Sequence, residues 1–69
     1  MEDKDFNRIK VVLVEHKRTA QWLSEALGKD PATVSKWCTN TTQPSLETLF
    51  KISELLQVPV QELIKKQNI

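Results

Sequence analysis

The fold is decided by residues 19–40, which read TAQWLSEALGKDPATVSKWCTN. Thr19 is a favourable N-cap, and Gly28, the single glycine of the chain, suits the positive φ at which helices often end. Asp30 and Pro31 then mark a second helix start, with the aspartate as N-cap and the proline at the first helical position. These signals predict two short helices joined by a turn of about three residues, a helix-turn-helix.

Helices are also predicted on both sides of this segment, because apolar residues recur at helical spacing and never sustain a period of two. One helix is expected at about residues 5–16 and another at residues 46–56, with Ser45 as its N-cap. Val58-Pro59 should break the chain before a short fifth helix at about residues 60–66. Asn40 tolerates the left-handed conformation and is expected to end the third helix.

The apolar faces of these helices define a candidate core. Trp37 lies three residues after Val34 and is expected to be buried, whereas Trp22 is expected either to cover the edge of the core or to lie partly exposed. The other predicted inward residues are Phe6, Ile9, Val12, Leu13, Leu23, Ala26, Leu27, Leu46, Leu49, Phe50, Ile52, Ser53, Leu56, Val60, Leu63 and Ile64. The sequence therefore predicts an all-α fold class, a compact bundle of five short helices in a single domain of residues 1–69.

The composition limits the class of protein further. With 39% hydrophobic and 28% charged residues among 69, the chain has the composition of one small globular domain rather than of a disordered tail. The formal net charge of +1 argues against a strongly basic, non-specific nucleic-acid binder. The charge is uneven, since residues 7–43 carry six cations and three anions (+3) and the rest carries four cations and six anions (−2).

Catalytic, metal and membrane roles find little support. One cysteine and one histidine provide neither an internal disulfide nor the four ligands of a structural zinc site. The acidic N-terminus does not resemble a signal peptide, and the longest apolar run, Val11–Val14, is too short to span a membrane. Cys38 and His16 have no third residue to orient them as nucleophile and base, so we expect no enzyme. A single cysteine fits a reducing compartment, so we expect a cytoplasmic protein. Cys38 is expected to be a small buried residue, and His16 a residue that favours a helix C-terminus.

The outward residues of the predicted third helix are small and polar, with Lys36 as the one long donor. Short side chains such as Ala32, Thr33 and Ser35 let a helix approach the DNA major groove closely. Lys36 can donate to guanine O6 or N7, and the methyl groups of Ala32 and Thr33 can meet that of thymine. The same composition also fits an ordinary solvated helix, and composition alone does not decide between the two.

Residues 7–64 resemble the helix-turn-helix domain of the phage repressor and Cro proteins, the XRE family. The resemblance rests on residues 19–37 and on Gln43-Pro44-Ser45-Leu46-Glu47-Thr48-Leu49, and it covers more than four fifths of the chain. It implies a lambda-repressor-like fold and sequence-specific binding of double-stranded DNA by a nucleoid-associated transcriptional regulator. It further implies a homodimer formed through about residues 58–69, repression at a pseudo-palindromic operator, and no cofactor, metal or small-molecule ligand.

The resemblance also implies roles for particular residues. Those expected to read bases lie at the start and along the outer side of the third helix, and they are Pro31, Ala32, Thr33, Ser35 and Lys36. Those expected to contact the phosphate backbone lie at the start of the second helix, in the turn and in the loop after the third helix, and they are Ala20, Gln21, Lys29, Asn40, Thr41, Thr42 and Gln43.

The chain departs from the family pattern at several positions. Ala20 replaces a glutamine that contacts phosphate, and Ser24 replaces a small residue that is usually alanine. Many members pair an arginine of the first helix with a glutamate at the end of the recognition helix, but here those positions are Leu13 and Cys38. We expect these two apolar side chains to touch in place of the ion pair, an exchange that often costs little stability.

A second class of function stays open at this point. The same helical fold could serve as a protein-interaction module, antitoxin-like or directed at a phage component, with DNA binding secondary. The modest net charge is compatible with it. Salt distinguishes the two. Contacts to phosphates release counterions, so the affinity of a DNA binder falls steeply as the salt concentration rises, whereas that of a protein-only module should not.

Overall fold

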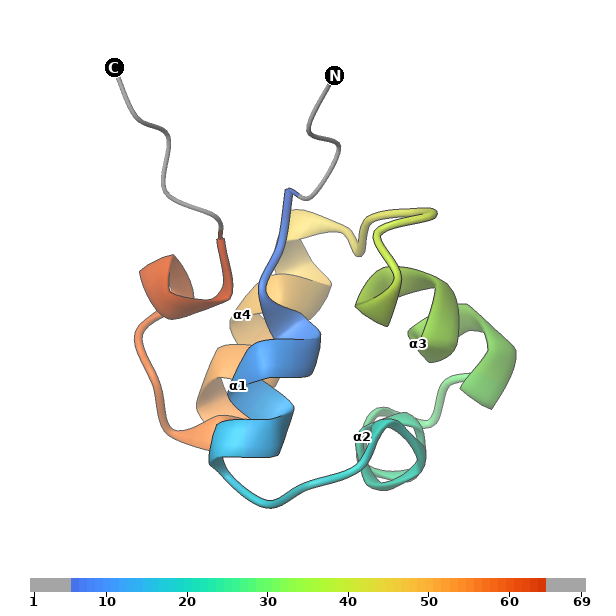
Figure 1. Cartoon of the computed structure of the whole chain (residues 1–69), viewed down its shortest axis with the longest axis horizontal. Coiled ribbons are helices and arrows are strands. Elements are labelled where there is room, and N and C mark those ends of the chain that lie inside the picture. The colour runs from blue at the N-terminus through green and yellow to red at the C-terminus, as the bar shows by residue number, and fades with distance from the viewer. Residues whose placement is uncertain (1–5, 65–69) are drawn as a thin grey trace.

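The computed structural model describes residues 6–64, which form four α-helices and one short 3-10 helix around a shared core (Figure 1). The elements are α1 (Ile9–Glu15), α2 (Ala20–Leu27), α3 (Pro31–Cys38), α4 (Leu46–Leu56) and η1 (Val60–Leu63). The only bridge within residues 6–64 is an isolated antiparallel pair, Asn7 with Ile64. The all-helical class predicted from the sequence is therefore confirmed.

The residues predicted to begin and end the helices of the helix-turn-helix do so in the structure. Thr19 Oγ1 accepts from the Trp22 amide at 3.0 Å, and Asp30 Oδ1 accepts from the Ala32 amide at 2.8 Å. Gly28 ends α2 with φ of +68°, and Asn40 follows the α3 cap with φ of +61°. Ser45 caps α4 through the Thr48 amide at 3.2 Å. Short-range hydrogen bonding thus fixes where α2, α3 and α4 begin.

The ends of the described chain correct two predictions. The first helix begins at Ile9, not near Asp5, which lies outside the described residues. The predicted fifth helix is a single 3-10 turn that ends at Leu63, and the residues predicted to extend it to Lys66 lie outside the described range. Both helices are short because Asn7 and Ile64 adopt an extended pairing, in which the Arg8 amide donates to the Leu63 carbonyl at 2.8 Å.

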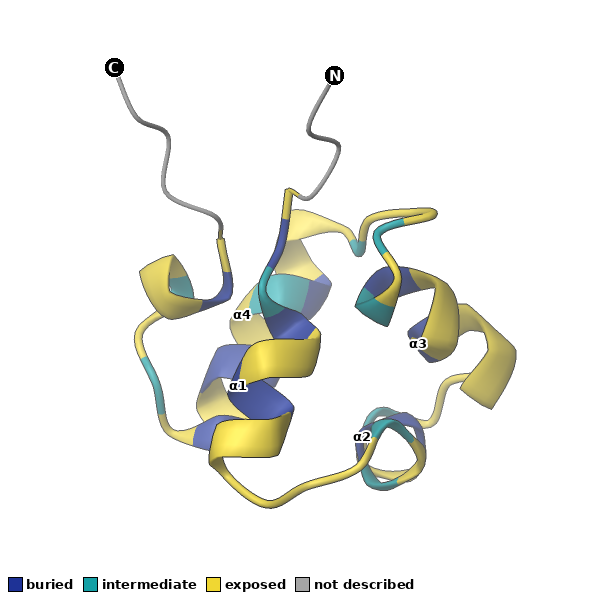
Figure 2. Ribbon diagram, viewed as in Figure 1, coloured by how far each residue is buried: buried dark blue, intermediate teal, exposed yellow. Residues whose placement is uncertain are grey.

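The core receives side chains from all five elements, as the dark blue segments of Figure 2 show. Trp37 is buried, as predicted, and Trp22 is half-buried at the edge of the core. Ser24 is buried as well, and its hydroxyl donates to the Gln21 carbonyl at 2.8 Å. The buried apolar residues are Ile9, Val12, Leu13, Leu23, Val34, Trp37, Ile52, Leu56 and Leu63.

Several residues predicted to face inward do not. Leu46 and Phe50 are 66% and 51% exposed, because α4 buries the row that contains Thr48, Ile52 and Leu56, and the two lie on a different row. Phe6 is 56% exposed because its segment is extended rather than helical. The remaining residues that prove exposed are Ala26 and Ile64. No helix within residues 6–64 is both long and apolar enough to cross a membrane.

Candidate nucleic-acid interface

α3 lies at the edge of the molecule, joined to α2 by the short turn at Gly28 (Figure 1). Its inward side chains, Val34 and Trp37, are buried against the core, which fixes how the helix is rotated. That rotation turns the other side of α3 toward solvent, and Figure 2 shows this side as exposed. The residues predicted to read bases are all exposed there: Pro31, Ala32, Thr33, Ser35 and Lys36.

The residues predicted to contact phosphate around α2 are also accessible. Gln21 and Lys29 are exposed and Ala20 is half-buried. Thr19 Oγ1 is occupied by the Trp22 amide, so the Ala20 and Gln21 amides in the first turn have no acceptor within the helix. The start of α2 can therefore donate to an anion.

The loop after α3 divides into two kinds of residue. Thr41 and Thr42 are exposed, with the Thr41 hydroxyl 2.8 Å from that of Thr39. Asn40 and Gln43 instead direct their amides into the protein. Asn40 Oδ1 accepts from the backbone amides of Phe6 and Asn7 at 2.9 and 3.0 Å. It also accepts from Gln43 Nε2 at 3.1 Å, so these two side chains fix the loop, and their contact with phosphate stays a prediction.

Asn7 is a residue that the sequence did not single out. It is only 7% exposed, and its Nδ2 donates to the Trp37 carbonyl at 3.0 Å and to Gln43 Oε1 at 2.7 Å. Its Oδ1 accepts from the Ile9 amide at 3.0 Å. An asparagine two residues before a helix is a recognisable local signal for the last bond, but partners 30 and 36 residues away leave no trace in the sequence.

Leu13 and Cys38 line one recess of about 310 Å³ between α1, α2 and α3. Leu13 is one of the buried core residues, and the half-buried Cys38 packs against the core cluster. Burial raises the pKa of the Cys38 thiol, against a smaller opposing effect of the Lys10 charge. The two residues thus share an apolar environment, as their replacement of a charged pair suggests, and their direct contact stays a prediction.

Cys38 and His16 line different recesses. That of His16 is also lined by Arg18, Leu55 and Gln57. Within residues 6–64 no group of three or more His, Cys, Asp or Glu side chains is placed to hold a metal ion. The polar features that the structure does bring together are those of α2, α3 and the loop after α3.

A helix-turn-helix family model, HTH_3, matches residues 9–63, which is most of the chain and includes all five elements. The chain belongs to this helix-turn-helix family. The match confirms the resemblance to the XRE family of helix-turn-helix domains, and α2 and α3, joined by the short turn at Gly28, are the pair of helices within it that fits the motif. In such a pair the second helix generally enters the major groove while the first crosses the DNA backbone.

A solved structure has the same fold. The crystal structure of a candidate DNA-binding protein from Bacteroides fragilis is similar to this chain, with 53% sequence identity and a TM-score of 0.86. The similarity covers 87% of this chain and 97% of that chain. The comparison with curated proteins gave no match.

Proposed function

We propose that this chain binds double-stranded DNA sequence-specifically through α3 and regulates transcription. The observation that carries the proposal is the division of α3 into a buried row, Val34 and Trp37, and an exposed row of small residues with Lys36. A helix whose rotation is fixed by its core side can present its outer side to the bases in one orientation. Membership of the helix-turn-helix family and the similarity to the Bacteroides fragilis protein support this function.

The exposed residues divide into two roles. Lys36, Ser35 and Thr33 can donate to base edges in the major groove, and the methyl groups of Ala32 and Thr33 can meet thymine. The exposed Gln21, Lys29, Thr41 and Thr42 contact phosphates, which position α3 without reading sequence. The half-buried Ala20 contributes its backbone amide.

The active form is a homodimer that binds a pseudo-palindromic operator and acts as a repressor. Two copies of α3 then enter successive major grooves about 34 Å apart. In the described part of the dimerisation region, Ile64 is exposed and Leu63 belongs to the core, while residues 65–69 lie outside the described range. Phe6 is exposed close to Ile64, next to the bridge between Asn7 and Ile64, so both are available to a second copy.

Selection of bound sites from random duplex DNA tests the proposed function. We expect a pseudo-palindromic motif whose half-sites lie about ten base pairs apart, and a Lys36→Gln variant that loses preference at one position of each half-site. Lys51→Gln, which removes the same charge from the exposed surface of α4, is the matched control and should leave the preference unchanged. If no motif is enriched and any binding is insensitive to salt, the protein-interaction module becomes the better explanation.

A further inference from the structure

We infer that the recess between α1, α2 and α3 binds a small organic anion, a carboxylate with an apolar body. The recess has a volume of about 310 Å³. Ligand pockets of proteins occupy about 300–1,000 Å³, so this one is at the small end of their range. At ~30 Å³ for each water molecule of the liquid, it offers the room of about ten waters, enough for a small aromatic or aliphatic acid.

Most of the wall of the recess is apolar. Leu13 and Val14 come from α1, Ala20 begins α2 and Cys38 ends α3. Leu13 is buried whereas Val14 is 67% exposed, so the apolar wall extends from the core to the surface. Leu13 and Cys38 stand where the resembling family often carries an arginine and a glutamate, and these shorter side chains leave room. The hydrophobic effect favours a ligand whose body covers this wall.

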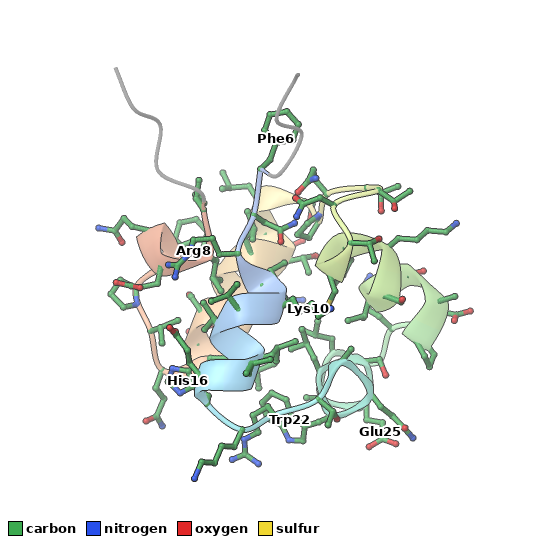
Figure 3. The ribbon with its side chains drawn as sticks, viewed as in Figure 1. Phe6, Arg8, Lys10, His16, Trp22 and Glu25 are labelled. Carbon is green, nitrogen blue, oxygen red and sulfur yellow. The ribbon has the colours of Figure 1, made fainter. Side chains whose placement is uncertain are left out.

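The recess also has a positive charge, which comes from Lys10. Lys10 lies on the side of α1 that faces α3 (Figure 3), and it lines the recess together with Cys38. Burial raises the pKa of the Cys38 thiol and the Lys10 charge opposes this effect, so the charge acts at the apolar wall. Among residues 6–64 no aspartate or glutamate lines the recess, and the ion pair of Arg8 with Glu62 does not involve Lys10. An apolar wall with one uncompensated cation favours an apolar ligand that carries one negative charge.

The hydroxyl of Ser35 is the second donor available to the ligand. Thr19 Oγ1 already caps α2, and Thr39 Oγ1 donates to a backbone carbonyl of α3 at 3.2 Å. The Arg18 guanidinium is stacked on an indole ring, 4.7 Å from its centroid, which directs its charge away from the apolar wall. Ser35 is exposed at the recess, so a carboxylate there has Lys10 and Ser35 as its donors.

Occupation of the recess has a consequence for DNA, and this part of the inference rests on the proposed function. Ser35 belongs both to the recess and to the exposed row of α3. A carboxylate that accepts from Ser35 removes one donor from that row and adds negative charge beside the surface that meets the phosphates. The ligand therefore lowers DNA affinity and acts as an effector that releases the protein from DNA.

The single cysteine of the chain provides the test, because it lies in the recess. Benzoate is the probe, and benzamide, which has the same shape without the charge, is its control. Benzoate should slow the alkylation of Cys38 by iodoacetamide, since the bound ligand covers the thiol. It should bind weakly, in the millimolar range, and benzamide about two- to fivefold more weakly still. Changes in the amide NMR signals of Ala20, Ser35 and Cys38 verify where benzoate binds.

Two variants locate the charge. Lys10→Gln should weaken benzoate binding about two- to fivefold and leave benzamide binding unchanged. Lys51→Gln removes the same charge from the exposed surface of α4, outside the recess, and should bind both probes as the original chain does. Protection is measured relative to the same variant without ligand, because Lys10 itself acts on the thiol. Equal protection by benzoate and benzamide, no protection by either, or full benzoate binding by Lys10→Gln would each overturn the inference.

DNA affinity tests the effector role separately. It should be about fivefold lower in benzoate than in the same concentration of acetate, which matches the salt but lacks the apolar body. Equal affinities in the two salts, at a benzoate concentration that protects Cys38, would overturn the effector role and leave both the ligand site and the proposed function standing. A chain that binds no DNA in either salt would overturn the proposed function and the effector role, while alkylation alone decides the ligand site.

Discussion

Polar groups on the outer side of α3 differ in their bonding from those at its carboxyl end and in the loop that follows. Along the outer side, Thr33, Ser35 and Lys36 are exposed to solvent. At the carboxyl end, the Trp37 carbonyl and the Gln43 side chain are both bonded to the buried Asn7. The polar groups at one end of the helix are therefore satisfied within the protein and anchor it, whereas those on its outer side are free to bind a partner.

The largest effect is expected from removing the anchor. Asn7→Ala deletes three hydrogen bonds and leaves the Trp37 carbonyl, Gln43 Oε1 and the Ile9 amide without that partner. Unsatisfied buried groups cost roughly 1–3 kcal/mol each, and partial access to water keeps the expected total loss at about 3 kcal/mol. Urea unfolding measures it.

Thr42→Ala, in the exposed part of the same loop, is the matched control for Asn7→Ala and should stay within about 0.5 kcal/mol of the original stability. An Asn7→Ala protein as stable as the control would show that the carboxyl end of α3 needs no anchor, and the contrast between the two parts of the helix would disappear.

A smaller effect is expected from restoring half of the ion pair that the family often carries. Cys38→Glu places a carboxylate beside Leu13, which cannot donate to it, at a half-buried site. Because the nearby Lys10 offsets part of the desolvation, we expect a loss of about 1 kcal/mol, less than for a fully buried unpaired charge. Thermal unfolding measures this, with Cys38→Ala as the control for lost volume, and equal stability of the two variants would contradict the apolar contact.

The smallest effect on stability is expected on the outer side of α3. Ser35→Ala and Lys36→Gln change exposed side chains, so each should alter the free energy of unfolding by less than about 0.5 kcal/mol. The same changes should cost about 1–3 kcal/mol of discrimination between DNA sequences. Large losses of stability here would mean that the outer side of α3 also stabilises the fold, as its carboxyl end does.

Local signals explain what the sequence could predict. Thr19, Gly28, Asp30 and Pro31 each act on backbone groups within a few residues, so the helix-turn-helix and the exposed row of α3 could be located before the structure was seen. The residues of the exposed row are accessible as predicted, and their contacts with DNA stay predictions.

The errors arise where distant parts of the chain compete with local preference. Leu46 and Phe50 are as apolar as the buried residues of α4, and only the packing of other elements decides which row faces inward. Phe6 fits the periodicity of α1 but belongs to an extended segment paired with Ile64. Asn7 depends on partners in α3 and in the loop after it, which periodicity cannot identify.

The bridge between Asn7 and Ile64 has a consequence for protein engineering. Because these residues pair, the described chain enters and leaves the domain at the same place. A short linker could therefore connect the two ends, and new termini could open at the exposed turn around Lys17, between α1 and α2. Such a circular permutant would keep every helix continuous and would move the point of fusion for a reporter or a second domain.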